Sequence, residues 1–493
     1  MENQLPSGWT EFLLSETGEW LGGGTPSKSN PAYWNGSIPW VSPKDMKKAS
    51  IENTEDFITP AAIEESSVKL IPEGAVLFVT RSGILAHSFP VATTKKRVTV
   101  NQDLKAIVPV PAIDPEFLAW YLRANTRAIL NSCTKYGTTV HSIEVPSLKS
   151  WAIAVPPVNE QQRIVARIEA LFSELDKGIE ALKTAREQLK VYRQAVLKHA
   201  FEGRLTAQWR EENKDRLESP EQLLARIQQP EQPRGGRQAS KEVIEGIAAL
   251  AVNKPKKVPP KGWTWVPLLR IARQETGHTP SRKYPEYWDG DQYWIGIADA
   301  RLHHGKKISD TLQKVTLKGL DNSSARTLPK DTVCLSRTAS VGYVCIMGRP
   351  MATSQDFATW TCTEAIDPKF LMYAFMAEGN EIRRFGKGTT HTTIYFPEIR
   401  ALHICLPSPQ EQKVIVDSVE SKLQQIDTIN AEIETQLSRA ETLRQSILRK
   451  AFTGQLVPQD PNDEPASVLL ERIRAEKAQQ TQPTRGTRRK KTA

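Results

Sequence analysis

Two short loops carry side chains that could hydrogen-bond to a polar or anionic partner. Each loop reads Thr-Pro-Ser followed by a basic residue. The candidate contact residues in them are Thr25, Ser27, Lys28, Thr279, Ser281 and Arg282. Hydroxyls both donate and accept hydrogen bonds, and a lysine or arginine can bind phosphate or the acceptors on a guanine edge. A plain turn held by local hydroxyl bonds is the alternative.

Further polar side chains occur at expected strand ends and turns. Arg81-Ser82 and Arg337-Thr338 each follow an apolar run, which places each arginine near a strand end, within reach of guanine or phosphate. Alternatively, either arginine could form a structural ion pair within the protein. Gln102 and Gln355 each precede an aspartate and could contact adenine or simply hold a turn. The remaining candidates are Lys44, Thr138, Thr139, His141, Thr389, Thr390 and His391. The sequences around His141 and His391 differ, which is expected if the two loops contact different partners or if the loop is unconstrained.

The elements that position these residues occur twice, because the chain is a tandem repeat. Trp9 recurs as Trp263, 254 positions later, and Tyr33-Trp34 recurs as Tyr287-Trp288 at the same offset. The order of the matches is kept along the chain, and the offset settles at 251 in the second part of each copy. We expect the paired aromatics to pack in a core rather than to stack on bases. The repeat predicts two related domains.

Each copy begins with short apolar runs separated by turn residues, which predicts a mixed α/β globule with one helix over residues 116–130. A proline-free, seven-residue apolar pattern follows and predicts a long helix that packs along one seam. The first row is Ile168, Leu175, Leu182, Leu189 and Val196, with Leu171 or Phe172, Ala185 and Tyr192 between. The second row is Val419, Ile426, Ile433, Ala440 and Ile447, with Leu423, Leu437 and Leu443 beside it.

These patterns predict an α+β chain with two mixed α/β domains separated by two long antiparallel coiled-coil helices in a pseudo-twofold repeat. Antiparallel helices would separate the globules, and parallel helices would place them side by side. The expected segments are domain 1 (1–155), spacer helix 1 (156–205), a linker with short helices (206–259), domain 2 (260–406), spacer helix 2 (407–456) and a C-terminal segment (457–493). We expect one linker helix over 241–251. The basic stretch 485–491 is expected to be disordered and either attracts phosphate or is simply solvated.

Charge and composition narrow the class of protein. Lysine and arginine total 66 against 56 acidic residues, a net charge of +10, which suits a nucleic-acid partner or a mildly basic soluble protein. The five cysteines form no CxxC pair or zinc pattern, so we expect free thiols and no metal. Without a signal-peptide pattern or an apolar stretch of membrane-spanning length, we expect a cytoplasmic protein with no membrane contact.

Two junctions carry a family resemblance. Residues 155–168 and 406–416 resemble the point at which specificity subunits of type I restriction-modification systems pass from a recognition domain into a spacer helix. The helix ends at 200–205 and 451–456 and the Thr-Pro-Ser loops are also similar to that family, the loops to its DNA-facing loop. The resemblance implies a non-catalytic subunit whose two domains each read one half of a bipartite, asymmetric site in double-stranded DNA.

The resemblance further implies that the spacer helices set the gap between half-sites and dock two modification subunits, which bind S-adenosylmethionine and methylate adenine. Two restriction motor-nuclease subunits would join them with ATP and Mg²⁺, and this chain itself would hold no cofactor. The sequence has no Walker loop, HExxH, GxSxG or adenine-methyltransferase motif. A non-reading scaffold, or the specificity subunit of a methylation-only or fused restriction-modification system, is the alternative.

Overall fold

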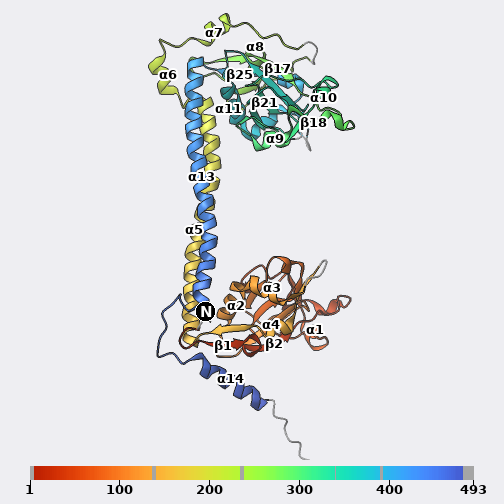
Figure 1. Cartoon of the computed structure of the whole chain (residues 1–493), viewed down its shortest axis with the longest axis vertical. Helices are drawn as coiled ribbons and strands as arrows, with labels where there is room; N and C mark the ends of the chain where they lie inside the picture. The colour runs from red at the N-terminus through yellow and green to blue at the C-terminus, as the bar shows by residue number, and fades with distance from the viewer. Residues whose placement is uncertain (1–4, 136–139, 234–237, 339, 389–391, 481–493) are drawn as a thin grey trace, which may run out of the picture. The chain divides into compact units, whose positions relative to one another are not determined.

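The computed structural model describes residues 5–135, 140–233, 238–338, 340–388 and 392–480 (Figure 1). The chain forms two compact units, one from residues 1–182 and 435–493 and the other from residues 183–434. Each unit contains one mixed α/β globule and part of each of two long helices.

The first globule is built on a central five-stranded sheet. The strands of the whole globule are β1 (Thr10–Leu13), β2 (Gly18–Gly22), β3 (Trp34–Val41), β4 (Ser50–Ile51), β5 (Asp56–Ile58), β6 (Val76–Val79), β7 (Arg81–Ser82), β8 (Val91–Thr94), β9 (Thr99–Val100), β10 (Leu104–Pro109), β11 (Thr134–Lys135), β12 (His141–Ile143) and β13 (Ala152–Val155). The central sheet has the order β2-β10-β6-β8-β4, and only its β8-β4 pair is parallel. The sheets β5-β3-β9 and β11-β12-β7 and the pair β1-β13 complete this globule.

The second globule repeats this central sheet. Its strands are β14 (Ile244–Glu245), β15 (Leu250–Val252), β16 (Thr264–Pro267), β17 (Ala272–Thr276), β18 (Trp288–Ile295), β19 (Lys307–Ile308), β20 (Gln313–Val315), β21 (Val333–Ser336), β22 (Val344–Met347), β23 (Ala352–Thr353), β24 (Phe357–Cys362) and β25 (Leu402–Leu406). The central order is β17-β24-β21-β22-β19, again with only the last pair parallel. The sheets β20-β18-β23 and β14-β15-β25-β16 lie beside it. The shared order confirms the predicted α+β tandem repeat.

Buried strands hold each globule together. All four residues of β6 are buried, and Phe78 in that strand packs against Trp20 and Phe89 with ring centres 5.4 and 5.8 Å away. In the second globule Trp360 is fully buried with its ring centre 4.8 Å from that of Phe375. Burying one side chain of this size contributes roughly 1.5–3 kcal/mol. The central sheets are therefore well-packed bases for the loops at their ends.

Short helices cover the sheets. In the first globule they are α1 (Pro60–Glu64), α2 (Pro115–Ala124), α3 (Thr126–Cys133), α4 (Val145–Lys149) and the 3-10 helices η1 (Leu14–Glu16), η2 (Pro31–Tyr33) and η3 (Gly83–Ala86). In the second they are α8 (Leu268–Ile271), α9 (Ile297–Leu302), α10 (Leu317–Asp321), α11 (Pro368–Glu378), α12 (Phe396–Arg400), η4 (Pro285–Tyr287) and η5 (Gly379–Phe385). The helix predicted over 116–130 forms, but as α2 and α3. Asn125 separates them, because its side-chain amide donates to the carbonyl of Tyr121 at 2.9 Å.

The two long helices are α5 (Val158–Phe201) and α13 (Pro409–Phe452), each of 44 residues. In the first unit Asp176 forms an ion pair with Arg444. In the second unit Arg186 contacts Glu434 at 2.9 Å, and Arg193, one heptad further along α5, pairs with Asp427, one heptad back along α13. The helices therefore run antiparallel. Every residue of the two predicted seven-residue rows is buried or half-buried, as a seam requires.

Two residues assigned to the seam are about half exposed. Tyr192 is 51% exposed and Leu443 is 49% exposed. Their neighbours Arg193 and Arg444 take the inward positions instead and make the ion pairs across the helices. Adjacent residues on an α-helix are about 100° apart, because a turn holds 3.6 residues, so Tyr192 points away from the partner helix. Leu443 lies at the edge of the seam, where it lines a groove with Leu175 and Leu182 of α5.

The connections between the main elements include structure that the sequence patterns did not reveal. The helices α6 (Ala207–Asn213) and α7 (Pro220–Arg226) form, but the helix predicted over 241–251 is wrong, because that segment contains β14 and β15. The buried carboxylate of Glu378 accepts hydrogen bonds from the backbone N–H groups of residues 247–250, which fixes them outside a helix. Helix α14 (Ala466–Gln480) was not predicted. The basic stretch 485–491 lies outside the described residues.

Candidate nucleic-acid interface

In both globules the Thr-Pro-Ser loop is joined by a hydrogen bond to a glutamine far away in the sequence. Thr279 donates through Oγ1 to Oε1 of Gln355 at 2.6 Å, and Thr25 makes the same bond to Gln102. Both contacts are exposed to solvent. The structure thus brings two of the predicted sites together, although 76 and 77 positions separate their partners in the chain.

The predicted arginines lie next to these glutamines. The backbone N–H of Arg337 donates to the carbonyl of Asp356 at 2.8 Å, and that of Arg81 donates to Asp103 at 3.2 Å. Each arginine therefore follows its strand, as predicted, and meets the turn that carries the glutamine. In the first globule the turn is held by Asn101, whose Oδ1 accepts from the N–H of Asp103 at 3.0 Å. The glutamine side chain is consequently not needed to hold the turn.

The segment around His141, and its counterpart in the second globule, also lie beside the predicted arginines. In the first globule His141 pairs with Ser82, which joins β12 to β7. In the second globule the hydroxyls of Thr338 and Thr393 are 2.8 Å apart, and the N–H of Ile394 donates to the carbonyl of Arg337 at 2.8 Å. The predicted residues Thr138, Thr139, Thr389, Thr390 and His391 lie outside the described residues.

Tryptophans brace the Thr-Pro-Ser loops. The indole N–H of Trp34 donates to the carbonyl of Ser27 at 3.1 Å, and Trp288 makes the same bond to Ser281 at 3.4 Å. Trp34 also packs edge-on against Trp40 at 5.2 Å. The aromatic pairs therefore contribute to packing, as predicted. The loops are also turns with local bonds, but this does not occupy the exposed side chain of Lys28.

Two basic candidates are already paired inside the protein. Lys44 does not join the loop contacts, because its amine forms ion pairs at 2.9 Å with Glu55 and with Asp56, which raise the pKa of the lysine. The guanidinium of Arg282 lies 4.3 Å from the ring centre of Trp288 and donates to Gln313 at 2.9 Å. Either side chain would have to share or exchange these contacts to meet a further partner.

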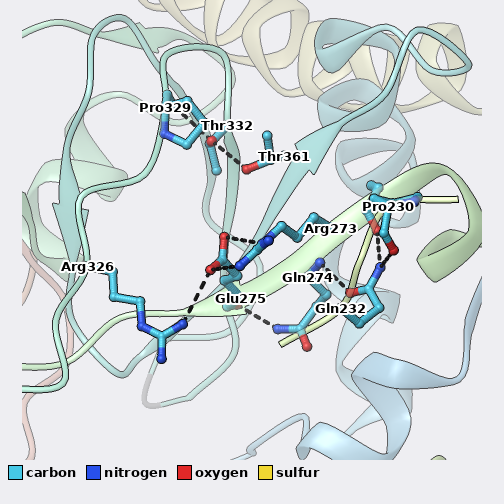
Figure 2. A network of polar contacts seen from close by, with 10 residues as sticks. Pro230, Gln232, Arg273, Gln274, Glu275, Arg326, Pro329, Thr332 and Thr361 are labelled. Atoms are coloured by element: carbon cyan, nitrogen blue, oxygen red, sulfur yellow. Dashed lines mark hydrogen bonds and ion pairs between the residues drawn. The ribbon is translucent and has the colours of Figure 1, made fainter. Parts of the chain in front are cut away.

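The second globule has an additional arginine-rich hollow beside this face. Glu275 lies between two guanidinium groups, 3.2 Å from Arg273 and 3.8 Å from Arg326, as Figure 2 shows. Arg337 packs its guanidinium over the ring of Phe396 at 4.3 Å. Its Nη2 donates to the carbonyl of Gln355 at 3.0 Å, and burial lowers the pKa of this arginine. The roles of Phe396 and Arg326 were not predicted, because contacts between distant segments leave no local pattern.

Nothing in the described part of the chain suggests a metal centre, since no three histidine, cysteine or acidic side chains gather there in a suitable group. The same residues include no helix that is long and apolar enough to cross a membrane. The chemistry that this face offers is hydrogen bonding by hydroxyl, amide and guanidinium groups.

Sequence comparison explains why the face occurs twice. The family described as Type I restriction modification DNA specificity domain matches residues 6–184 and again residues 260–439. The chain belongs to this specificity family. Each match contains one Thr-Pro-Ser loop, its glutamine and the first part of the long helix that follows.

Several curated specificity subunits are similar to this family member. That of EcoR124I/EcoR124II from Escherichia coli is 40% identical over 185 residues, which are 36% of this chain and 46% of that protein. That of MjaIX from Methanocaldococcus jannaschii is 30% identical over 201 residues, 40% of this chain and 45% of that protein. These two matches thus span about half the length of each relative. That of EcoKI from Escherichia coli K12 is 22% identical over 500 residues, 96% and 97% of the two chains.

Solved structures show that this specificity-family chain shares the fold. A chain in a structure of type I R-M complex assembly and conformational transition has a TM-score of 0.66 at 18% identity, covering 92% of this chain and 99% of its own. The HsdS subunit from Thermoanaerobacter tengcongensis has a TM-score of 0.57 at 18% identity, covering 92% and 98%. At this identity the similarity concerns the fold.

Proposed function

We propose that the chain is the DNA-reading specificity subunit of a type I restriction-modification complex and carries no catalytic site of its own. Residues 1–155 and 260–406 would be two target recognition domains, each reading one half of a bipartite, asymmetric site in double-stranded DNA. The observation that carries the proposal is the repeated contact of the Thr-Pro-Ser loop with a glutamine beside a strand-end arginine. Exposed hydroxyl, amide and guanidinium groups are the donors and acceptors that read base edges and phosphates.

Differences around the shared contact support two distinct readings. Lys28 in the first loop corresponds to Arg282 in the second, and Ser82 corresponds to Thr338. The exposed Arg81 has a counterpart, Arg337, that is half-buried. A common frame with different surrounding side chains is expected of two domains that present the same geometry to different bases.

The two long helices would set the distance between the half-sites. A helix of 44 residues is about 66 Å long at 1.5 Å per residue. Ion pairs between α5 and α13 in each unit hold them in one antiparallel register. A rigid spacer that lets both domains bind at once raises the effective concentration of the second domain at its half-site. Two domains of low DNA affinity then bind together with high affinity. We further propose that residues 156–205 and 407–456 are the spacers, joined by the linker 206–259 and followed by the segment 457–493.

The remaining parts of the complex belong to the same proposal. The spacers would dock two modification subunits, which bind S-adenosylmethionine and methylate adenine. Two restriction motor-nuclease subunits would use ATP and Mg²⁺. A complex that acts on chromosomal DNA would place this chain in the cytoplasm.

Methylome sequencing of a host that carries the chain with its modification partner tests the function. We expect methylated adenines in one asymmetric motif of two short halves with a constant gap, absent from a matched host without the gene for this chain. A continuous motif, or methylation that persists without this chain, would contradict the proposal.

A further inference from the structure

A cavity of about 470 Å³ opens in the second globule next to the Thr279–Gln355 contact. Its wall includes residues 277 and 278 at the start of the Thr-Pro-Ser loop. Three arginines also line it, Arg326, Arg337 and Arg400. The cavity therefore adjoins the proposed DNA-reading face and is strongly basic.

Arg337 is fixed at the wall of this cavity. Phe396 covers one face of its guanidinium, and the carbonyl of Gln355 takes one N–H of Nη2 at 3.0 Å. Its Nε–H is buried and has no hydrogen-bond partner among the described residues. A half-buried guanidinium with further N–H donors can form charge-assisted hydrogen bonds to a ligand that brings acceptors.

The cavity has an excess of positive charge. The carboxylate of Glu275, which also lines it, contacts both Arg273 and Arg326 (Figure 2). Glu275 therefore offsets only part of the local charge. Within the described part of the chain, Arg400 has no carboxylate within ion-pair distance. Arg337 and Arg400 thus both line the cavity and have no ion-pair partner among the described residues.

We propose that this cavity binds one phosphate of the DNA backbone beside the half-site read by the second globule, with Arg326, Arg337 and Arg400 as the ligands. This inference rests on the proposed function. Phosphate fits better than a base edge, because a guanine offers two acceptors and is satisfied by one arginine, whereas three arginines that line one cavity match an anion with several oxygens.

The first globule differs from the second in this region. Trp20 stands at the position of Gln274, which lines the cavity, and Lys149 stands at the position of Arg400. The amine of Lys149 lies 5.3 Å from the ring centre of Trp20, so the cation packs on the indole. Val145 occupies the position of Phe396 and offers no aromatic face to an arginine. The basic residues of this region are therefore arranged differently in the two globules.

The salt dependence of DNA binding provides the first test. The full-length chain, assembled with its modification subunits, would be titrated with a duplex carrying the methylome motif at several salt concentrations. We expect Arg400→Gln to weaken binding about tenfold at low salt, equally for the motif and for single-base variants, and to reduce the slope of log K against log salt by roughly one. Arg301→Gln is the control, since this exposed arginine does not line the cavity.

A methylphosphonate scan locates the contact. Replacing backbone phosphates one at a time should reveal one linkage beside the second half-site whose neutralisation weakens wild-type binding but no longer affects Arg400→Gln. Thermal melting of each variant confirms that it is folded, and Arg326→Gln gives a second, more exposed substitution. An unchanged slope, or a methylated motif relaxed at one base, would overturn the phosphate assignment. If the wild-type complex itself shows no motif preference, the proposed function fails instead.

Discussion

Trp9 donates its indole N–H to Oε1 of Glu160 at 3.1 Å and so fastens the start of the first globule to the start of α5. Trp263 makes the equivalent bond to Glu411 at 3.1 Å. The two carboxylates are each 1% exposed, but their surroundings differ. Glu411 also forms an ion pair with Arg210 at 2.9 Å, whereas no cation lies within ion-pair distance of Glu160 among the described residues.

This difference predicts that the same substitution has a large effect in one unit and a small effect in the other. Glu411→Gln leaves Arg210, whose side chain is 14% exposed, without its partner and should destabilise the second unit by about 2–3 kcal/mol. Glu160→Gln keeps an acceptor for Trp9 and removes a buried charge, so the first unit should change by less than about 1 kcal/mol at pH 7. Calorimetry with hydrogen exchange, which assigns each transition to a unit, measures both. Equal losses in the two variants would be inconsistent with this account.

The buried carboxyl of Glu160 predicts that the stability of the first unit depends on pH. Burial raises the pKa of Glu160 above its ordinary value, and the bond from Trp9 only partly opposes this. A raised pKa means that the folded state binds the proton more tightly, so the free energy of unfolding falls as pH rises from the unfolded pKa to the folded one. Hydrogen exchange of the first unit between pH 4 and 7 should show this loss in wild type but not in Glu160→Gln. An identical profile in both would contradict the prediction.

Gln355→Ala should alter one half of the DNA motif only. The substitution removes the acceptor of Thr279 and one exposed amide beside Arg337. Because a wrong base at a directly read position costs about 1–3 kcal/mol, discrimination in one half should fall by roughly 10- to 100-fold. Gln102→Ala is the matched variant and should relax the other half. Methylation of duplexes with single-base changes measures both, and an equal effect of either variant on both halves would count against separate readers.

Glu378 should be essential for the second unit. Its carboxylate accepts four backbone N–H groups from residues 247–250 at 2.6 to 3.1 Å. An amide in its place would direct its own N–H₂ at these donors, so Glu378→Gln should cost about 2–3 kcal/mol of unfolding free energy. Glu381→Gln is the control, because that carboxylate is half-exposed and, among the described residues, its one ion pair is with the exposed Arg384. Chemical denaturation followed by hydrogen exchange provides the comparison, and similar stability in both variants would refute this role.

The spacers can be tested by shortening them. Removing one heptad from both α5 and α13 shortens the paired helices by about 10 Å, which is roughly three base pairs of rise. Methylome sequencing should then show a shorter gap with both halves unchanged. Deletion from one helix only is the control, since it moves the opposed ion pairs of Arg186 and Arg193 out of register and should abolish methylation. Rewritten halves with an intact gap would rule out the spacer role.

The sequence predicted what depends on local pattern. The seven-residue rows define α5 and α13 because burial along one seam imposes that period. Tyr192 was misassigned because a helix of 3.6 residues per turn drifts against a strict heptad, and the pattern does not show that Arg193 takes the inward place. Helix α14 had a signal in Leu469-Leu470-Glu471-Arg472-Ile473, which repeats the Leu223–Ile227 segment of α7 and its flank.

The candidate site was predicted as separate residues rather than as an arrangement. Thr279 and Gln355 were both identified, but their hydrogen bond depends on the order of strands in the central sheet. Phe396 was missed because its contact with Arg337 joins segments 59 positions apart. The segment 241–251 was misread as a helix, since its backbone conformation is decided by the distant Glu378.

The most direct test of two independent readers is an exchange of the first domain. Replacing residues 1–155 with the corresponding domain of another specificity subunit, followed by methylome sequencing, should change one half of the motif and leave the other half and the gap intact. A change in both halves, or in neither, would contradict the account.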